Sequence, residues 1–277
     1  MASDLFDDFR RAMSDPDEGI DLARAALEIA RDDYPDLDAA RYLRRIDRLA
    51  VDVLERLGNE KTVYHRIAAL NAVMFEEHGF RGNRDNYYDP KNSFLNEVIE
   101  RRTGIPISLS VLYMEVARRI GLPLNGVNFP GHFLVKYFDD REKIVIDPFN
   151  GGEIKSKEGL AKLLESLYGG KIPLAGDFLE PVTKKQIIRR MLNNLKAIYI
   201  RENSFLKGLA VLQRLVILNP LSAEDIRDRG AVYLKLECFQ HALADFENYL
   251  ELAPHAKDAD AVKGEIIALR QQVQQIH

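Results

Sequence analysis

Apolar residues recur with helical spacing through the first eighty residues of the chain. The spacing predicts a helix from about residue 22 that ends before Tyr34-Pro35, a second helix after a capping Asp36 or Asp38, and a third over Thr62–His78. The apolar face of the second helix is formed by Leu43, Ile46, Leu49, Ala50, Val53 and Leu54. Residues 82–92 are polar and rich in turn-forming types, which predicts a long loop that either rims a groove or is simply solvated.

The pattern changes in the middle of the chain. One helix is predicted from Phe94 to about Arg102, and a second one follows the break at Gly104-Ile105-Pro106 and ends near Ile120. Strands are then predicted at residues 124–128, 132–138 and 143–147. Helices followed by antiparallel strands predict an α+β core with a helical N-terminal part.

An internal repeat marks the last third of the chain. Residues of the same type recur 34 positions apart, in the pairs Ala197/Ala231, Tyr199/Tyr233, Phe205/Phe239, Leu209/Leu243, Ala210/Ala244 and Pro220/Pro254. This is the period of tetratricopeptide repeats, whose stacked helix pairs present a concave face to a protein or peptide partner. The alternative is an appendage that covers the core.

These patterns predict three domains along the chain. Residues 1–90 are expected to form the helical N-terminal part of the core and residues 91–185 the rest of the core. The repeats, with a capping helix over residues 259–275, are expected to occupy residues 186–277.

Composition and charge narrow the range of partners. With 39 basic and 43 acidic residues the formal net charge is −4, and no basic stripe is apparent, so nucleic acid is not an expected partner. No apolar run is long enough to span a bilayer, and the single cysteine, Cys238, fits a reducing compartment. We therefore expect a cytoplasmic protein without a membrane partner, metal or cofactor.

An imidazole–carboxylate pair is predicted on two neighbouring strands. His132 opens one predicted strand and Asp147 ends the next. If Asp139-Asp140 is a two-residue hairpin loop, paired positions sum to 279, as 132 and 147 do; any even loop length keeps both side chains on one face. An imidazole held by a carboxylate is the base half of a nucleophilic triad. The alternative is a buried polar pair with no catalytic role.

Several long motifs, in order, resemble a known family. They are Ala25–Leu37, Asn92–Leu109, Pro130-Gly131-His132-Phe133 and Ile146-Asp147-Pro148-Phe149. With the repeats behind them, they resemble the SirB-type branch of the transglutaminase-like superfamily, which joins a transglutaminase-like core to a tetratricopeptide tail. The resemblance covers nearly the whole chain. It implies a cysteine-protease-like arrangement of a helix and an antiparallel sheet, followed by an all-α region, in a regulatory protein.

The resemblance also implies a catalytic triad with one member missing. Active members of the superfamily place a cysteine at the start of a helix, directly after a Gly-x step, and the triad continues with a histidine and an Asp-Pro aspartate. Here Gly104-Ile105 matches the Gly-x step, so the cysteine position falls on Pro106, while His132 and Asp147 match the other two members. Proline suits a helix start because it needs no N–H there, but it supplies no nucleophile. The resemblance therefore implies a degenerate core in a regulatory or protein-interaction protein.

An enzymatic alternative remains open. Ser108 is a nearby hydroxyl that would act as the nucleophile of a hydrolase or acyl transferase, with His132 as base and Asp147 as the group that orients it. A serine in the first turn of a helix more often caps the backbone.

Three further residues are candidates for binding. The amides of Asn92 and Asn96 lie just upstream of Pro106 and can donate to an oxyanion or to a ligand carbonyl. Asn92 is alternatively the N-cap of the helix that starts near Phe94. Gly131 either permits close backbone approach before the histidine or serves a turn.

Overall fold

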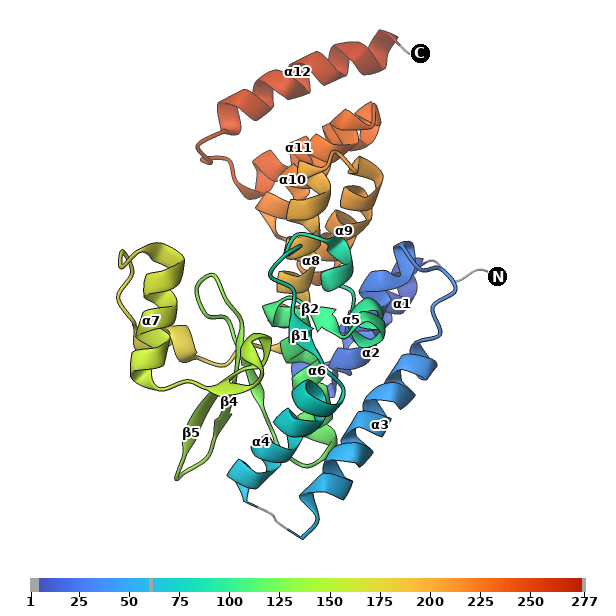
Figure 1. The fold of residues 1–277 in the computed structure, drawn as a ribbon. Helices are drawn as coiled ribbons and strands as arrows, with labels where there is room; N and C mark the ends of the chain where they lie inside the picture. Colours follow the sequence, from blue (N-terminus) through green and yellow to red (C-terminus); the bar gives the residue numbers. More distant parts are fainter. Residues whose placement is uncertain (1–4, 60–61, 276–277) are drawn as a thin grey trace. The chain divides into compact units, whose positions relative to one another are not determined.

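The computed structural model describes residues 5–59 and 62–275 (Figure 1). The chain divides into two units, each with its own contacts. The larger unit is Ala12–Met191, and the smaller one combines the N-terminal helix up to Arg11 with the chain from Leu192 onward. The fold is of the α+β class and rich in helix, as the sequence predicts.

Helices form the first half of the larger unit. Their bounds are α1 (Leu5–Ser14), which reaches into both units, α2 (Leu22–Glu28), α3 (Ala39–Leu57), α4 (Val63–Asn71), continued by a π-helical turn at Ala72–Glu77, and α5 (Leu95–Arg101). Side-chain caps fix three of the starts, because the side chains of the cap residues accept hydrogen bonds from backbone N–H groups: Asp21 from Arg24, Asp38 from Arg41, and Thr62 from His65.

Helix α6 (Pro106–Arg119) is the centre of the larger unit. Every residue from Pro106 to Ala117 is buried, and this stretch includes the polar residues Ser108, Ser110 and Glu115. It contacts α2, α3 and α5 as well as β3 and β4 (Figure 1). The first turn of α6, with proline at its first position, is thereby fixed inside the core.

An antiparallel sheet packs between α6 and α7 (Lys157–Tyr168). Its strands follow chain order as β3 (Asn125–Val127), β4 (Leu134–Phe138), β5 (Lys143–Asp147) and β6 (Glu153–Ile154), and a separate parallel pair joins β1 (Arg81–Gly82) to β2 (Thr103–Gly104). Leu160 and Leu164 of α7 pack on side chains of the three longer strands. The other face is directed to α6, since side chains alternate along each strand.

The β4–β5 hairpin corrects the predicted loop length. Paired positions sum to 281 rather than 279, as in the Val135–Ile146 pair, so the loop holds four residues. The carboxylate of Asp139 accepts hydrogen bonds from the backbone N–H groups of Arg141 (2.8 Å) and Glu142 (2.7 Å), which stabilises this longer turn. His132 and Asp147 are therefore not directly opposite each other, although an even loop length still keeps their positions on one face.

The smaller unit confirms the repeat. It contains the end of α8 (Lys184–Arg201), then α9 (Phe205–Leu218), α10 (Ala223–Lys235), α11 (Phe239–Leu252) and α12 (Ala259–Gln275). The bounds of α11 are those of α9 shifted by 34 residues. The left-handed residues before these helices, Asn203 (φ 56°) and Glu237 (φ 58°), are shifted by the same amount. The period therefore describes the turn geometry as well as the residue types.

Candidate functional site

A tight turn positions His132 just before β4. His132 N donates to Phe129 O at 3.0 Å, with Pro130 second in the turn and Gly131 third at a φ of +66°. Proline and glycine at these places are the residue types that a type II turn favours. Gly131 therefore lies in the turn that directs the imidazole. His132 itself precedes the first strand residue by two positions instead of opening the strand, as the sequence analysis had placed it.

Arg190 of α8 holds this turn from outside the sheet. Its guanidinium donates to His132 O at 2.8 Å and to the side-chain oxygen of Asn128, and it lies 5.3 Å over the Phe133 ring. These contacts fix the backbone on both sides of the Pro130-Gly131 step. Arg190 lies 58 residues from His132 along the chain and belongs to no motif, so no signal in the sequence links the two.

His132 and Asp147 form a buried pair. Nε2 of His132 lies 2.9 Å from Oδ1 of Asp147, and the two residues are 6% and 0% exposed. The carboxylate also accepts from Asn150, through the backbone N–H (3.3 Å) and through Nδ2 (2.7 Å), and Nζ of Lys155 lies 3.7 Å from Oδ2. Both carboxylate oxygens are thus engaged, as a buried charge requires.

These contacts determine the charge of the site. Burial by itself raises the pKa of Asp147, but the hydrogen bond and charge of His132, together with Asn150 and Lys155, outweigh it and bring the pKa below its ordinary 3.8. The carboxylate is therefore ionised at neutral pH and orients the ring through Nε2. Within residues 5–59 and 62–275, Nδ1 has no hydrogen-bond partner. It is the ring nitrogen that remains to serve as a base.

Aromatic side chains enclose the imidazole. The Phe149 ring meets the His132 ring edge-on, with centroids 5.7 Å apart, and Tyr87 meets Phe149 in the same manner at 6.4 Å. The Arg84 guanidinium lies 5.4 Å over the Phe149 ring. Gly82 permits this packing, because a Cβ there would be only 2.5 Å from that ring. The 82–92 loop therefore packs against Phe149, which in turn shields the pair.

The start of α6 carries no free nucleophile. Pro106 is its first residue and is buried. The Ser108 hydroxyl, also buried, donates to Asn92 O at 2.6 Å and accepts from Ile105 N at 3.1 Å, which closes the first helical turn. Its hydrogen bonds do not include His132. The geometry agrees with the capping alternative for this serine.

Asn92 holds the 82–92 loop rather than a helix end. Its Oδ1 accepts from Asn83 Nδ2 at 3.0 Å, and its Nδ2 donates to Asn86 O at 2.7 Å and to Tyr87 O at 3.2 Å. The N-cap of α5 is Phe94, so the prediction that Asn92 caps this helix is wrong. Both ends of the Asn92 amide are engaged in shaping the loop.

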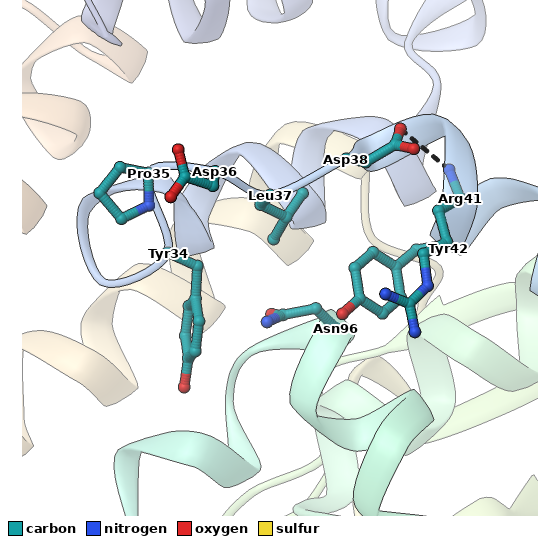
Figure 2. Close-up of a pocket in the computed structure, with 8 residues that line it drawn as sticks. All are labelled: Tyr34, Pro35, Asp36, Leu37, Asp38, Arg41, Tyr42 and Asn96. Atoms are coloured by element: carbon teal, nitrogen blue, oxygen red, sulfur yellow. Dashed lines mark hydrogen bonds between the residues drawn. The ribbon is translucent and has the colours of Figure 1, made fainter.

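Asn96 lies in a separate pocket on the helical side of the same unit (Figure 2). The pocket has a volume of about 330 Å³ and is lined by Tyr34, Pro35, Asp36, Leu37, Asp38, Arg41, Tyr42 and Asn96. Asn96 is 3% exposed, and its Oδ1 has no hydrogen-bond partner among the residues described. His132 and Asp147 are not among the lining residues. The binding residues predicted from sequence are thus divided between two places.

The described part of the chain holds neither a metal-ligand cluster nor a membrane-spanning helix. There, no group of three or more His, Cys, Asp or Glu side chains is arranged to hold a metal ion. None of the described helices has the length and apolar character needed to cross a bilayer. Cys238 is half-buried at the start of α11, where its Sγ lies 3.6 Å from Leu236 O.

Comparison with protein-family models divides the chain at nearly the place where the structure does. A model described as "Transglutaminase-like superfamily" matches residues 40–193, and one described as "Tetratricopeptide repeat" matches residues 195–266. The first match contains α6, the sheet and the His132–Asp147 pair, and the second contains α9 to α11.

Comparison with curated proteins finds relatives over most of the chain. A "UPF0162 protein" of Xylella fastidiosa (strain 9a5c) is 41% identical over 268 residues, which cover 94% of each chain. A "UPF0162 protein" of Vibrio cholerae is 31% identical over 91% of this chain and 93% of its own. Mouse "F-box only protein 21" is 39% identical over 138 residues, which make up 48% of this chain and 22% of the mouse protein.

Proposed function

Because the chain belongs to the transglutaminase-like superfamily and carries tetratricopeptide repeats behind its core, we propose that it is a non-catalytic regulatory protein that acts by binding other proteins. In this proposal the core retains the base half of a triad, His132 and Asp147, without a nucleophile. The observation that carries it is that α6 begins with Pro106, the position to which the sequence resemblance assigns the cysteine of active members.

The surroundings of the pair support the same conclusion. The imidazole lies behind Phe149 and is 6% exposed, so a substrate carbonyl has little access to it. The enzymatic alternative with Ser108 gains no support, since that hydroxyl is engaged at the helix start. The fully partnered carboxylate of Asp147 instead fits a structural role, in which the pair joins the turn before β4 to the end of β5.

The repeats supply the surface for a partner. A groove of about 650 Å³ is lined by Glu247, Leu250, Glu251, Lys263, Ile266, Ile267 and Arg270 of α11 and α12. Ile267 is 61% exposed there, beside charged side chains that can fix the register of a bound peptide. The single cysteine fits a reducing compartment, so we propose a cytoplasmic location as well.

The absence of catalysis is tested by incubating the full chain with amine donors plus glutamine peptides, and separately with peptide and ester substrates. We expect no turnover above buffer for the wild type, for His132→Ala, or for the control His255→Ala, which removes an exposed histidine. Turnover that persists in the control but disappears in His132→Ala contradicts the proposal.

The binding role is tested by affinity capture with the full chain and with Ile267→Asp. We expect specific proteins that the wild type and His132→Ala retain and that Ile267→Asp loses, because the new charge removes the apolar part of the groove. Identical sets from all three proteins would argue against a role for the repeats.

A further inference from the structure

The pocket around Asn96 combines aromatic walls with an unmet hydrogen-bonding group. Tyr34 and Tyr42 stand on either side, and Figure 2 shows the amide end of Asn96 directed toward the space between them. The tyrosine hydroxyls are engaged elsewhere, with Glu97 and Glu100 respectively. The Arg41 guanidinium lies 5.6 Å over the Tyr42 ring, so the Tyr34 ring, the edge of Tyr42 and the Asn96 amide are what these three residues offer to a ligand.

The unmet group is an acceptor in a buried place. Asn96 comes from the second position of α5, and its Oδ1 is inaccessible to water and has no partner among the residues described. Leaving a buried polar atom unpaired is costly, and such atoms are rare in folded proteins. A ligand that donates an N–H to this oxygen, after the Asn96 side chain turns the oxygen toward the pocket, would recover that cost.

The charges around the pocket favour a cation. Arg41 is balanced, because its guanidinium lies 3.2 Å from Glu100, which also pairs with Arg45. Asp36, by contrast, forms no ion pair or hydrogen bond with any described residue, although it lines the pocket and is exposed. Glu97, next to the pocket, likewise has no cation partner within the described ranges. Two carboxylates are thus left uncompensated.

From this combination we propose that the pocket binds the cationic side chain of a lysine or arginine supplied by a partner protein. The aliphatic stem packs between Tyr34 and Tyr42. The Arg41 guanidinium already lies 5.6 Å over the Tyr42 ring, so the Tyr34 ring is the face that attracts the new cation. The head donates one hydrogen bond to Asn96 Oδ1 and pairs with Asp36 at the rim. A volume of about 330 Å³ is at the small end for ligand sites, which suits one long side chain.

Other ligands fit less well. A phosphate or carboxylate would face Asp36 and Asp38 without a spare cation to receive it, because Arg41 is paired. A purely apolar side chain would leave Asn96 Oδ1 unpaired. The inference rests on the proposed binding function for the origin of the cation, but it uses neither His132 nor the repeats.

The test uses the full ¹⁵N-labelled chain and three capped glycine pentapeptides with lysine, arginine or norleucine at the centre. Norleucine keeps the apolar stem and removes the charge. Peptide is titrated at low ionic strength, and the side-chain NH₂ signals of Asn96 are followed. We expect saturable shifts with lysine, arginine or both, and none with norleucine. The response to each basic peptide identifies which cation the pocket accepts.

Variants separate the contributions. Asp36→Asn is expected to weaken binding about threefold, the size of an exposed ion pair, while Asp140→Asn in the exposed hairpin loop leaves it unchanged. Asn96→Leu is expected to weaken it at least about tenfold, followed through the backbone signals of Tyr34 and Tyr42. Asp36 is exposed, so its variant keeps the test valid if Asn96→Leu does not fold.

The proposal is overturned if no peptide moves the Asn96 signals, if norleucine binds as well as the basic residues, or if Asp36→Asn and Asp140→Asn behave alike. The experiment measures peptide binding at Asn96, so its result does not depend on whether the protein has catalytic activity. An active enzyme that still binds lysine at this pocket would overturn the proposed function and leave this inference intact.

Discussion

Replacing Asp147 by asparagine should show how much the buried pair stabilises the larger unit. The Asp147 carboxylate accepts hydrogen bonds from His132 and Asn150 and lies near Lys155. Asparagine can accept at only one oxygen, so its NH₂ group would face one of these donors, and the charge would be lost. A hydrogen bond to a charged group contributes about 1.5–3 kcal/mol. We therefore expect Asp147→Asn to lower the free energy of unfolding by about 2–4 kcal/mol at pH 7.

This penalty should depend on pH in a defined direction. The pKa of Asp147 is lower in the folded chain than its ordinary 3.8, so its contribution is complete above that value and is lost as pH falls through the folded pKa. The difference between wild type and Asp147→Asn should accordingly be constant from pH 7 to about pH 5 and shrink as pH falls below about 4.

Urea unfolding from pH 3 to pH 7, followed by tyrosine fluorescence and far-UV circular dichroism, measures both effects. Asp140→Asn removes an exposed carboxylate and should change stability by less than about 0.5 kcal/mol. In a double-mutant cycle, His132→Ala should be coupled to Asp147→Asn by about 1–3 kcal/mol. A penalty below about 0.5 kcal/mol at pH 7, or one that grows toward pH 3, would refute the reasoning.

Three other substitutions probe the packing around the site and in the repeats. Gly152→Ala should cost more than about 2 kcal/mol in urea unfolding, because its φ is +75° and the new Cβ would lie 2.0 Å from Oδ1 of Asn71. Gly230→Ala should destabilise the repeats by about 1–3 kcal/mol, measured by hydrogen exchange, since its Cβ would lie 2.9 Å from the Phe246 ring. Asn92→Ala should speed proteolysis within residues 83–91 several-fold, because the loop loses its internal hydrogen bonds.

Two glycines with open space around them provide matched controls for the first two. Gly151 also has a positive φ but open space around it, so Gly151→Ala should cost only about 1 kcal/mol. Gly264 lies in the exposed part of α12 with nothing nearby, and Gly264→Ala should stabilise that helix by about 0.5–1 kcal/mol. If Gly152→Ala and Gly151→Ala, or Gly230→Ala and Gly264→Ala, changed stability equally, the contacts with Asn71 and Phe246 would not explain the cost of the substitutions.

Features with a local or periodic cause could be predicted from the sequence. The repeat was visible because each helix pair uses the same residues at the same offset, from Phe205 and Phe239 to Pro220 and Pro254. The common face of positions 132 and 147 followed from the alternation of strand side chains, which is insensitive to an even change in loop length. The pairing register of the two strands could not be predicted, because the Asp139 side chain accepts hydrogen bonds from two backbone N–H groups and so stabilises a longer turn.

Features made by distant residues could not be predicted. Arg190 reaches the His132 turn from a helix whose own pattern indicates only packing. The pocket joins Tyr34 and Asn96, which are 62 residues apart, and no periodic signal links them. For Asn92 a local signal was present but misleading, because asparagine is a common helix cap, whereas here its side chain forms hydrogen bonds within the 82–92 loop.

The central claim is that Pro106 stands where a nucleophile would face the retained base, and the thiol pKa of Pro106→Cys tests it most directly. In a Cys238→Ser background, the ultraviolet absorbance of the thiolate is titrated with and without His132→Ala, and iodoacetamide labelling at neutral pH is compared with that of Cys238 in the wild type. Burial of this position raises a thiol pKa, whereas a helix start and an imidazole that faces the thiol lower it, so we predict a lower thiol pKa with His132 present than in His132→Ala. Relative to Cys238, labelling should be slower in His132→Ala than with His132 present. A thiol whose pKa and labelling rate ignore His132 would contradict the account.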